Sequence, residues 1–278
     1  MRLASTDQVE LAVHDLGGTG PPLLLAHATG FHGQMWGPLA AALAPRFHCW
    51  SFDFRGHGDS SRPVPPDYDW RGFGADALAV VDGLGLQRPF GLGHSQGGTA
   101  FLLAEQSRPA TFEALYLYEP VAYPSEPPPP PMNDHPLVTG ALRRHDRFDS
   151  ADAAVRHLGS KPPLADFRPE VLRAYVDHGV AALPDGGVGL KCRREDEAQV
   201  YRMGPSNPAF DHLGEVACPV TLARGSRSEA VSVGLAKRQV APLPDGRLEV
   251  LDGLGHFGPL EDPALVADAV IAALLGNQ

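Results

Sequence analysis

The segment Gly91-Leu92-Gly93-His94-Ser95-Gln96-Gly97-Gly98 decides how the rest of the chain is interpreted. Within it, residues 93–97 follow the pattern G-x-S-x-G, which is typical of a serine on a sharp turn between a strand and a helix. Such a turn strains the serine backbone and leaves no room for bulky side chains two residues away, so glycine is favoured there. Residues 88–92 resemble a strand, and residues 99–106 carry the apolar stripe of a helix. This order of elements makes Ser95 the candidate nucleophile.

Length and charge narrow the class of protein. The 278 residues suffice for one α/β domain with an insertion or for two small domains. The formal net charge of −10 is spread along the chain, which argues against a surface for nucleic acid or anionic lipid. The three cysteines have no spacing typical of a metal or redox pair, and Cys49 and Cys218 lie in apolar runs, where we expect buried thiols.

The sequence pattern predicts neither a targeting segment nor a membrane span. Residues 1–8 contain no apolar stretch of signal-peptide length, and no segment approaches the roughly 18 apolar residues of a membrane span. We therefore expect a cytoplasmic protein that is a monomer or homodimer, takes a small-molecule substrate, and binds neither nucleic acid nor membrane.

Strand-like and helical segments alternate along most of the chain, which predicts a parallel sheet in an α/β domain. The expected strands are 22–27, 48–53, 88–92, 111–118, 217–223 and 247–251, with residues 9–14 as an edge strand. Between the strands 111–118 and 217–223, residues 124–131 are mostly proline and predict a stiff extended linker. Helical patterns follow near 137–158, 168–182 and 194–203, with no strand expected between them. We predict a core of residues 1–120 and 213–278, interrupted by a helical lid insertion at 121–212.

Four ordered stretches resemble the α/β-hydrolase superfamily. They are His27-Ala-Thr-Gly-Phe31, Asp53-Phe-Arg-Gly-His-Gly-Asp-Ser60, the turn at Ser95, and Gly255-His256-Phe257. The resemblance is to the lid-bearing branch that includes small esterases, lactonases, C–C bond hydrolases and cofactor-free haloperoxidases. It implies an α/β-hydrolase fold, with a mostly parallel central sheet flanked by helices, and a triad of serine, histidine and acid.

His256 is the expected base of this triad, because it lies in a glycine-containing loop after the last strand. The acid is harder to assign. In the family it usually lies three residues after a glycine that here is Gly225, but that position is Ser228, which carries no charge. Glu229, one residue further, is our preferred acid, and Glu119, at the end of the strand after the nucleophile helix, is the runner-up. Asp252 is a third alternative.

The resemblance also implies an oxyanion hole made of two backbone N–H groups. By position these belong to Gln96 and Thr29, where His27-Ala28-Thr29 replaces the more frequent His-Gly-X. We assign His27, His94 and the loop of residues 55–59 to local structure. Residues 195–197, Glu-Asp-Glu, are interpreted as a solvated helix face. No metal-ligand spacing or dinucleotide fingerprint is present, so no cofactor and no metal are expected.

A serine nucleophile excludes the branch chemistries that need an aspartate, namely haloalkane dehalogenation and epoxide opening. We expect a serine hydrolase that cleaves an ester, thioester or lactone of a small-to-medium, largely uncharged substrate. The alternatives are a ligand receptor with vestigial turnover, and an acyltransferase or perhydrolase on the same fold. The lid offers apolar and aromatic side chains that either line a pocket or pack the lid onto the core. They are Leu137, Phe148, Leu158, Phe167, Tyr175, Tyr201 and Phe210.

Overall fold

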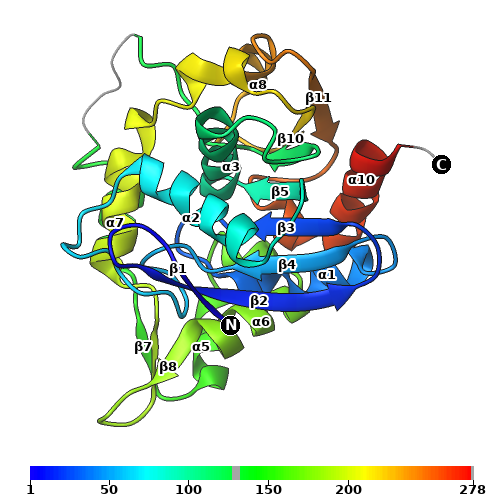
Figure 1. Cartoon of the computed structure of the whole chain (residues 1–278). Helices are drawn as coiled ribbons and strands as arrows, with labels where there is room; N and C mark the ends of the chain where they lie inside the picture. The colour runs from blue at the N-terminus through cyan, green and yellow to red at the C-terminus, as the bar shows by residue number, and fades with distance from the viewer. Residues whose placement is uncertain (127–131, 277–278) are drawn as a thin grey trace.

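The computed structural model describes residues 1–126 and 132–276, and its centre is an eight-stranded sheet (Figure 1). The strand order is β1-β2-β4-β3-β5-β6-β10-β11; β1 and β2 pair antiparallel, β2 runs antiparallel to β4, and every pairing from β4 to β11 is parallel. The strands are β1 Arg2–Ala4, β2 Glu10–Gly18, β3 Pro22–Ala26, β4 His48–Phe52, β5 Phe90–His94, β6 Leu115–Tyr118, β10 Val220–Gly225 and β11 Gly246–Leu251. The mostly parallel sheet predicted from the sequence is confirmed.

Helices cover both faces of this sheet, and the central strands are accordingly apolar on both sides. In β3, Leu23 and Leu25 belong to the core under α1 and α10, whereas Leu24 and Ala26 belong to the core under α2 and α3. This alternation follows from the two-residue period of a strand. The helices of the core are α1 Gly37–Leu43, α2 Trp70–Gly83, α3 Gln96–Ser107, α8 Val233–Val240, α9 Gly258–Glu261 and α10 Pro263–Leu275, with the 3-10 helix η1 at Gly33–Trp36.

The segment between β6 and β10, which we call the insertion, contains four α-helices among its described residues. They are α4 Pro136–Arg143, α5 Ala151–Leu158, α6 Pro169–Gly179 and α7 Arg194–Met203, and three 3-10 turns accompany them, η2 Leu164–Asp166, η3 Gly204–Ser206 and η4 Phe210–Glu215. The prediction that no strand lies here is wrong: β7 Arg147–Phe148, β8 Val180–Ala182 and β9 Val188–Leu190 form a small antiparallel sheet. Strands of two or three residues are too short to show a sequence period. Residues 127–131 of the predicted proline linker lie outside the described residues.

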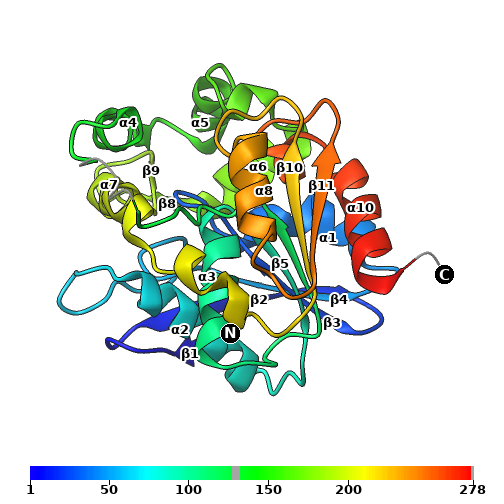
Figure 2. The same cartoon turned by 90° about the horizontal axis from the view of Figure 1, so that it is seen from above.

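The insertion lies beyond the carboxyl ends of β10 and β11, as the view in Figure 2 shows. Hydrogen bonds fasten it to the core at separate points. The N–H of Arg168 donates to the carbonyl of Leu260 at 3.0 Å, and the indole N–H of Trp70 donates to the carbonyl of Met203 at 2.7 Å. Since the carboxyl ends of parallel strands are where α/β proteins carry their sites, this placement directs attention to the space beneath the insertion.

The three cysteines are free and buried, as expected for Cys49 and Cys218. Burial raises the pKa of Cys49, Cys192 and Cys218 to about 12 in each case. The thiols are therefore protonated at neutral pH and pack as small apolar groups. None of the helices within residues 1–126 and 132–276 is both long and apolar enough to cross a membrane.

Candidate active site

Ser95 stands on a strained turn between β5 and α3. Its backbone has φ 54° and ψ −113°, a conformation that non-glycine residues rarely adopt. The flanking glycines are required by close backbone contacts: a Cβ on Gly97 would lie 2.2 Å from the carbonyl oxygen of Ala26, and one on Gly93 would lie 2.6 Å from the Cα of Gly98. The spacing seen in the sequence thus reflects backbone crowding on both sides of the serine.

The imidazole of His256 is hydrogen-bonded to the carboxylate of Glu119. The two atoms, His256 Nδ1 and Glu119 Oε2, are 2.7 Å apart. Because a carboxylate only accepts, Nδ1 carries the proton, and Nε2 is left free to act as a base. The ring of His256 also lies 5.1 Å, centre to centre, from the ring of His94, the residue before Ser95. Serine turn, histidine and acid therefore meet at the ends of β5, β11 and β6.

Glu119 is fully buried, and three donors satisfy its charge. The N–H of Gly225 donates to Oε1 at 2.9 Å, while the Ser228 hydroxyl donates to Oε2 at 2.6 Å, beside His256. A buried carboxylate without such partners would be costly. Glu119 also has a positive φ of 47°, a second strained residue at this end of the sheet.

Glu229, the acid preferred from the sequence, is not brought to His256. Its side chain is exposed, and the hydrogen bond of His256 goes to Glu119 instead. The physical reason is that β6 and β10 are neighbours, with Tyr118 opposite Ala223, so that the residue following β6 reaches the histidine loop directly. The third alternative, Asp252, is exposed and accepts a hydrogen bond from the Ser226 hydroxyl at 3.0 Å.

Hydrogen bonds from two side chains hold the loop that carries His256. The Tyr118 hydroxyl donates to the carbonyl of Gly255 at 2.7 Å, and Nε2–H of His94 donates to the carbonyl of His256 at 2.8 Å. Burial holds the pKa of His94 well below its ordinary value, so that its ring is neutral. The structural role expected for His94 agrees with these contacts.

Thr29 and Gln96, the expected oxyanion donors, are joined by their side chains. The Thr29 hydroxyl donates to Oε1 of Gln96 at 2.7 Å, and both residues are buried. Within residues 1–126 and 132–276, no hydrogen bond uses the backbone N–H of either residue. Gln96 also opens α3, where the first N–H groups have no partner inside the helix. The arrangement suits a developing negative charge beside Ser95.

Comparison with known proteins identifies the family. The sequence pattern described as "Alpha/beta hydrolase family" matches residues 23–269. The "Lipase LipV" of Mycobacterium tuberculosis is 31% identical, with 96% of this chain and 98% of that protein covered. A "Putative carbamate hydrolase RutD" of Caulobacter sp. is 32% identical, covering 92% and 91%.

This chain belongs to the alpha/beta hydrolase family. Membership makes it an enzyme with hydrolase activity. Among solved structures, that of E-2-(acetamidomethylene)succinate hydrolase superposes with a TM-score of 0.85 over 99% of this chain and 98% of the other, at 22% identity. The likeness extends through the insertion as well as the core.

In the hydrolase, a buried polar scaffold supports the loop of residues 27–32, which follows β3. His27 is neutral, with its Nε2 accepting from the N–H of Phe54 at 3.0 Å and its Nδ1–H donating to the carbonyl of Ala28 at 2.8 Å. The Asp53 carboxylate accepts from the N–H of Gly33 at 2.6 Å, and Arg55 forms a buried ion pair with Asp76 at 2.8 Å. These contacts agree with the structural role expected for His27 and the 55–59 loop.

Four buried neutral histidines of the hydrolase predict a loss of stability in mild acid. Burial lowers the pKa of His27 to about 3 and of His32 to about 4, and it also lowers the pKa values of His57 and His94. Between the ordinary pKa of about 6.5 and these values, the unfolded chain binds protons that the folded chain does not. Stability therefore falls as the pH falls from about 6.5 to about 4, by at most about 1.4 kcal/mol per pH unit for each histidine.

Urea unfolding at pH 7, 6 and 5 measures this slope. The variant His32→Gln, which keeps a side-chain donor for the carbonyl of Tyr175, is expected to show a shallower slope than the wild type. The matched control, His212→Gln, changes an exposed histidine, and the slope of His32→Gln is compared with the slope of this variant. A free energy of unfolding that stays level between pH 7 and pH 5 would contradict the prediction.

Aromatic rings join the insertion to the site. Phe31, in the loop of residues 27–32, has its ring 5.9 Å from Phe167 and 5.3 Å from Tyr175 of the insertion, and 5.7 Å from Phe257, the residue after His256. Among the lid side chains considered in the sequence, Phe148, Phe167 and Tyr175 are buried, whereas Leu137 is exposed. Phe167 and Tyr175 thus pack the insertion directly against the loops that contain Phe31 and Phe257.

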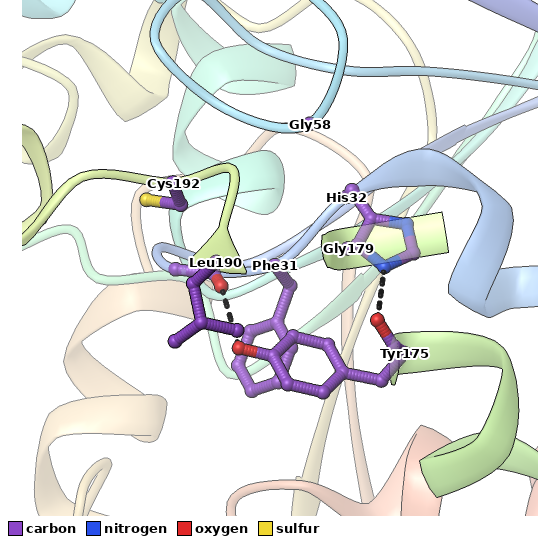
Figure 3. A pocket seen from close by; sticks show the side chains of 8 residues that line it. Phe31, His32, Gly58, Tyr175, Gly179, Leu190 and Cys192 are labelled. Carbon is purple, nitrogen blue, oxygen red and sulfur yellow. Dashed lines mark hydrogen bonds between the residues drawn. The ribbon is translucent and has the colours of Figure 1, made fainter. Parts of the chain in front are cut away.

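Beside this aromatic contact lies a small cavity of about 10 Å³, with room for about one water molecule. Figure 3 shows Tyr175 and His32 at its wall, with the carbonyl of Tyr175 bonded to Nε2 of His32 at 3.0 Å. The Tyr175 hydroxyl donates to the carbonyl of Gly30 at 3.5 Å. Leu190 and Cys192 close the other side. The loop of residues 27–32 and the insertion are therefore closely packed here.

The interpretation of residues 195–197 as a solvated helix face is wrong for two of the three. Asp196 and Glu197 are buried on α7, where Asp196 pairs with Arg62 and Glu197 with Arg144, each at 2.6 Å. Burial raises the pKa of Glu197, and Arg144 opposes that shift. A Cβ built on Gly30 would lie 2.6 Å from the Glu197 carboxylate, so this carboxylate lies against the loop of residues 27–32. The local sequence does not indicate that Asp196 and Glu197 are buried, because the arginines that pair with them come from distant segments.

Proposed function

We propose that this hydrolase is a serine esterase-type enzyme that cleaves an ester, thioester or lactone of a small-to-medium, largely uncharged substrate. The observation that carries the proposal is the hydrogen bond from His256 to the buried Glu119, formed beside a serine on a strained turn. In this assignment Ser95 is the nucleophile, His256 the base and Glu119 the acid. The aromatic side chains around Phe31 support an apolar acyl group.

In the proposed reaction, Nε2 of His256 takes the proton of the Ser95 hydroxyl as its oxygen attacks the substrate carbonyl. Glu119 stabilises the imidazolium that forms, and the N–H groups of Thr29 and Gln96 stabilise the oxyanion. The imidazolium then protonates the leaving group. Water, activated by the same histidine, hydrolyses the acyl-enzyme and restores Ser95. The insertion acts as a lid that limits which acyl groups reach the serine.

A fluorophosphonate probe tests the proposal, since it labels only activated serines. The wild type should gain one label, located on the peptide that contains Ser95, and should hydrolyse p-nitrophenyl acetate with steady turnover. Labelling with a burst but almost no turnover would favour the receptor. Transfer of the acetyl group to an added alcohol or peroxide in preference to water would favour the acyltransferase or perhydrolase. An unlabelled Ser95 would refute the nucleophile assignment.

Removing the hydroxyl that joins the two oxyanion residues should slow the reaction. Thr29→Val keeps the shape of the side chain and the backbone N–H but deletes the bond to Gln96. One neutral hydrogen bond is worth about 1 kcal/mol, so we expect kcat to fall about fivefold with little change in KM. Steady-state kinetics measure the effect, and Thr29→Ser, which restores the hydroxyl, is the control. Equal rates for Thr29→Val and the wild type would contradict the prediction.

A further inference from the structure

One oxygen of the Glu119 carboxylate accepts two hydrogen bonds. Oε2 lies 2.7 Å from Nδ1 of His256 and 2.6 Å from the hydroxyl of Ser228. The contact with His256 belongs to the proposed reaction, whereas the Ser228 hydroxyl takes no part in its bond changes. Ser228 comes from the loop after β10, which leaves the core beside β6 and its terminal Glu119.

The Ser228 hydroxyl donates its only hydrogen to Glu119. The same hydroxyl oxygen accepts from the N–H of Ala230 at 3.2 Å, which fills one of its lone-pair positions. A carboxylate oxygen only accepts, so the short contact with Glu119 requires the hydroxyl to donate. The bond is charge-assisted, a class that is shorter and stronger than a bond between neutral groups.

The loop that carries Ser228 is held on both sides. The buried guanidinium of Arg224 donates to the carbonyl of Ser228 at 2.6 Å and to that of Val231 at 2.9 Å. The N–H of Arg227 donates to the carbonyl of Leu254 at 2.9 Å, two residues before His256. The position of the hydroxyl is therefore fixed relative to both the acid and the base.

We infer that Ser228 is a positioning residue of the active site: its hydroxyl, together with the N–H of Gly225, fixes the plane of the Glu119 carboxylate so that Oε2 faces Nδ1 of His256. Without the hydroxyl, the carboxylate keeps the bond from Gly225 on Oε1, and the only donor left on Oε2 is His256 itself. No other group then holds the plane of the carboxylate toward the imidazole. His256 then spends less time in the orientation that accepts the Ser95 proton. The inference rests on the proposed function.

Kinetics of Ser228 variants test this role. Ser228→Ala, and Ser228→Cys, which keeps the shape with a weak donor, should each lower kcat about tenfold with KM unchanged. Ser228→Thr retains the hydroxyl and should stay within about twofold of the wild type. Glu229→Gln changes the next residue, which is exposed, and should leave kcat unchanged. Wild-type kcat in both Ser228→Ala and Ser228→Cys would overturn the inference.

Proton NMR provides a readout that needs no turnover. The proton between Nδ1 of His256 and Glu119 should give a low-field resonance, assigned by its loss in His256→Gln. Ser228→Ala should shift or broaden it, whereas Ser228→Thr and Glu229→Gln should not. If the wild type is not labelled at Ser95 but the resonance responds to Ser228→Ala, the proposed function fails and the positioning survives. If Ser95 is labelled and the resonance is the same in Ser228→Ala, the positioning fails alone.

Discussion

Glu119→Gln is expected to lower kcat by roughly 10³- to 10⁴-fold, with little change in KM. The amide oxygen of the glutamine should pair with the N–H of Gly225, which needs an acceptor, and its NH₂ group would then face Nδ1 of His256. Two donors cannot share a hydrogen bond, so the imidazole would move its proton to Nε2. In that tautomer it cannot accept the proton of Ser95. The loss also removes the charge that stabilises the imidazolium.

Glu229→Gln is the matched control, because it makes the same chemical change at the exposed carboxylate that the sequence favoured. It should retain wild-type kcat. Thermal unfolding of both variants distinguishes a catalytic defect from a folding defect, and Glu119→Gln should still melt cooperatively. An active Glu119→Gln together with an inactive Glu229→Gln would return the acid to Glu229 and refute the assignment made from the hydrogen bonds.

Ser95→Ala should abolish covalent labelling by a fluorophosphonate and lower kcat by roughly 10³-fold or more. Alanine cannot attack a carbonyl, and the remaining groups stabilise an oxyanion that no longer forms at the serine. Alanine is strained at φ 54° to the same degree as serine, so the fold should persist.

The measurement is intact mass after exposure to the probe, together with hydrolysis of p-nitrophenyl acetate. Ser226→Ala, which removes an exposed hydroxyl from the loop after β10, is the control and should be labelled like the wild type. Labelling that persists in Ser95→Ala would assign the reactive hydroxyl to another residue.

The sequence was sufficient to predict the fold and the sharp turn at Ser95, because these depend on local patterns. A strained turn needs small residues at fixed spacing, and buried parallel strands are apolar on both faces, as β3 shows. The choice between Glu119 and Glu229 depends instead on which strand end lies nearest to His256. This depends on the pairing of β6 with β10, which cannot be derived from the spacing of residues along the chain.

The polar residues of α7 show the same limit more sharply. Asp196 looks like part of a solvated acidic run until Arg62, 134 residues earlier in the chain, is placed beside it. Burial of a charge is decided by its partner, and here the partner lies in another segment. The short strands of the insertion were missed for a different reason, since β7 has only two residues and owes its conformation to pairing with β9.

Because all three thiols are buried and have raised pKa values, we expect the native protein not to react with maleimides and similar cysteine reagents at neutral pH. A single cysteine introduced at an exposed insertion residue, such as Leu137→Cys on α4, would therefore carry a fluorophore with no background from the natural sequence. A second introduced cysteine, at exposed Val250 on β11, would provide a reference on the core. The pair would report directly on whether the insertion moves when a substrate enters.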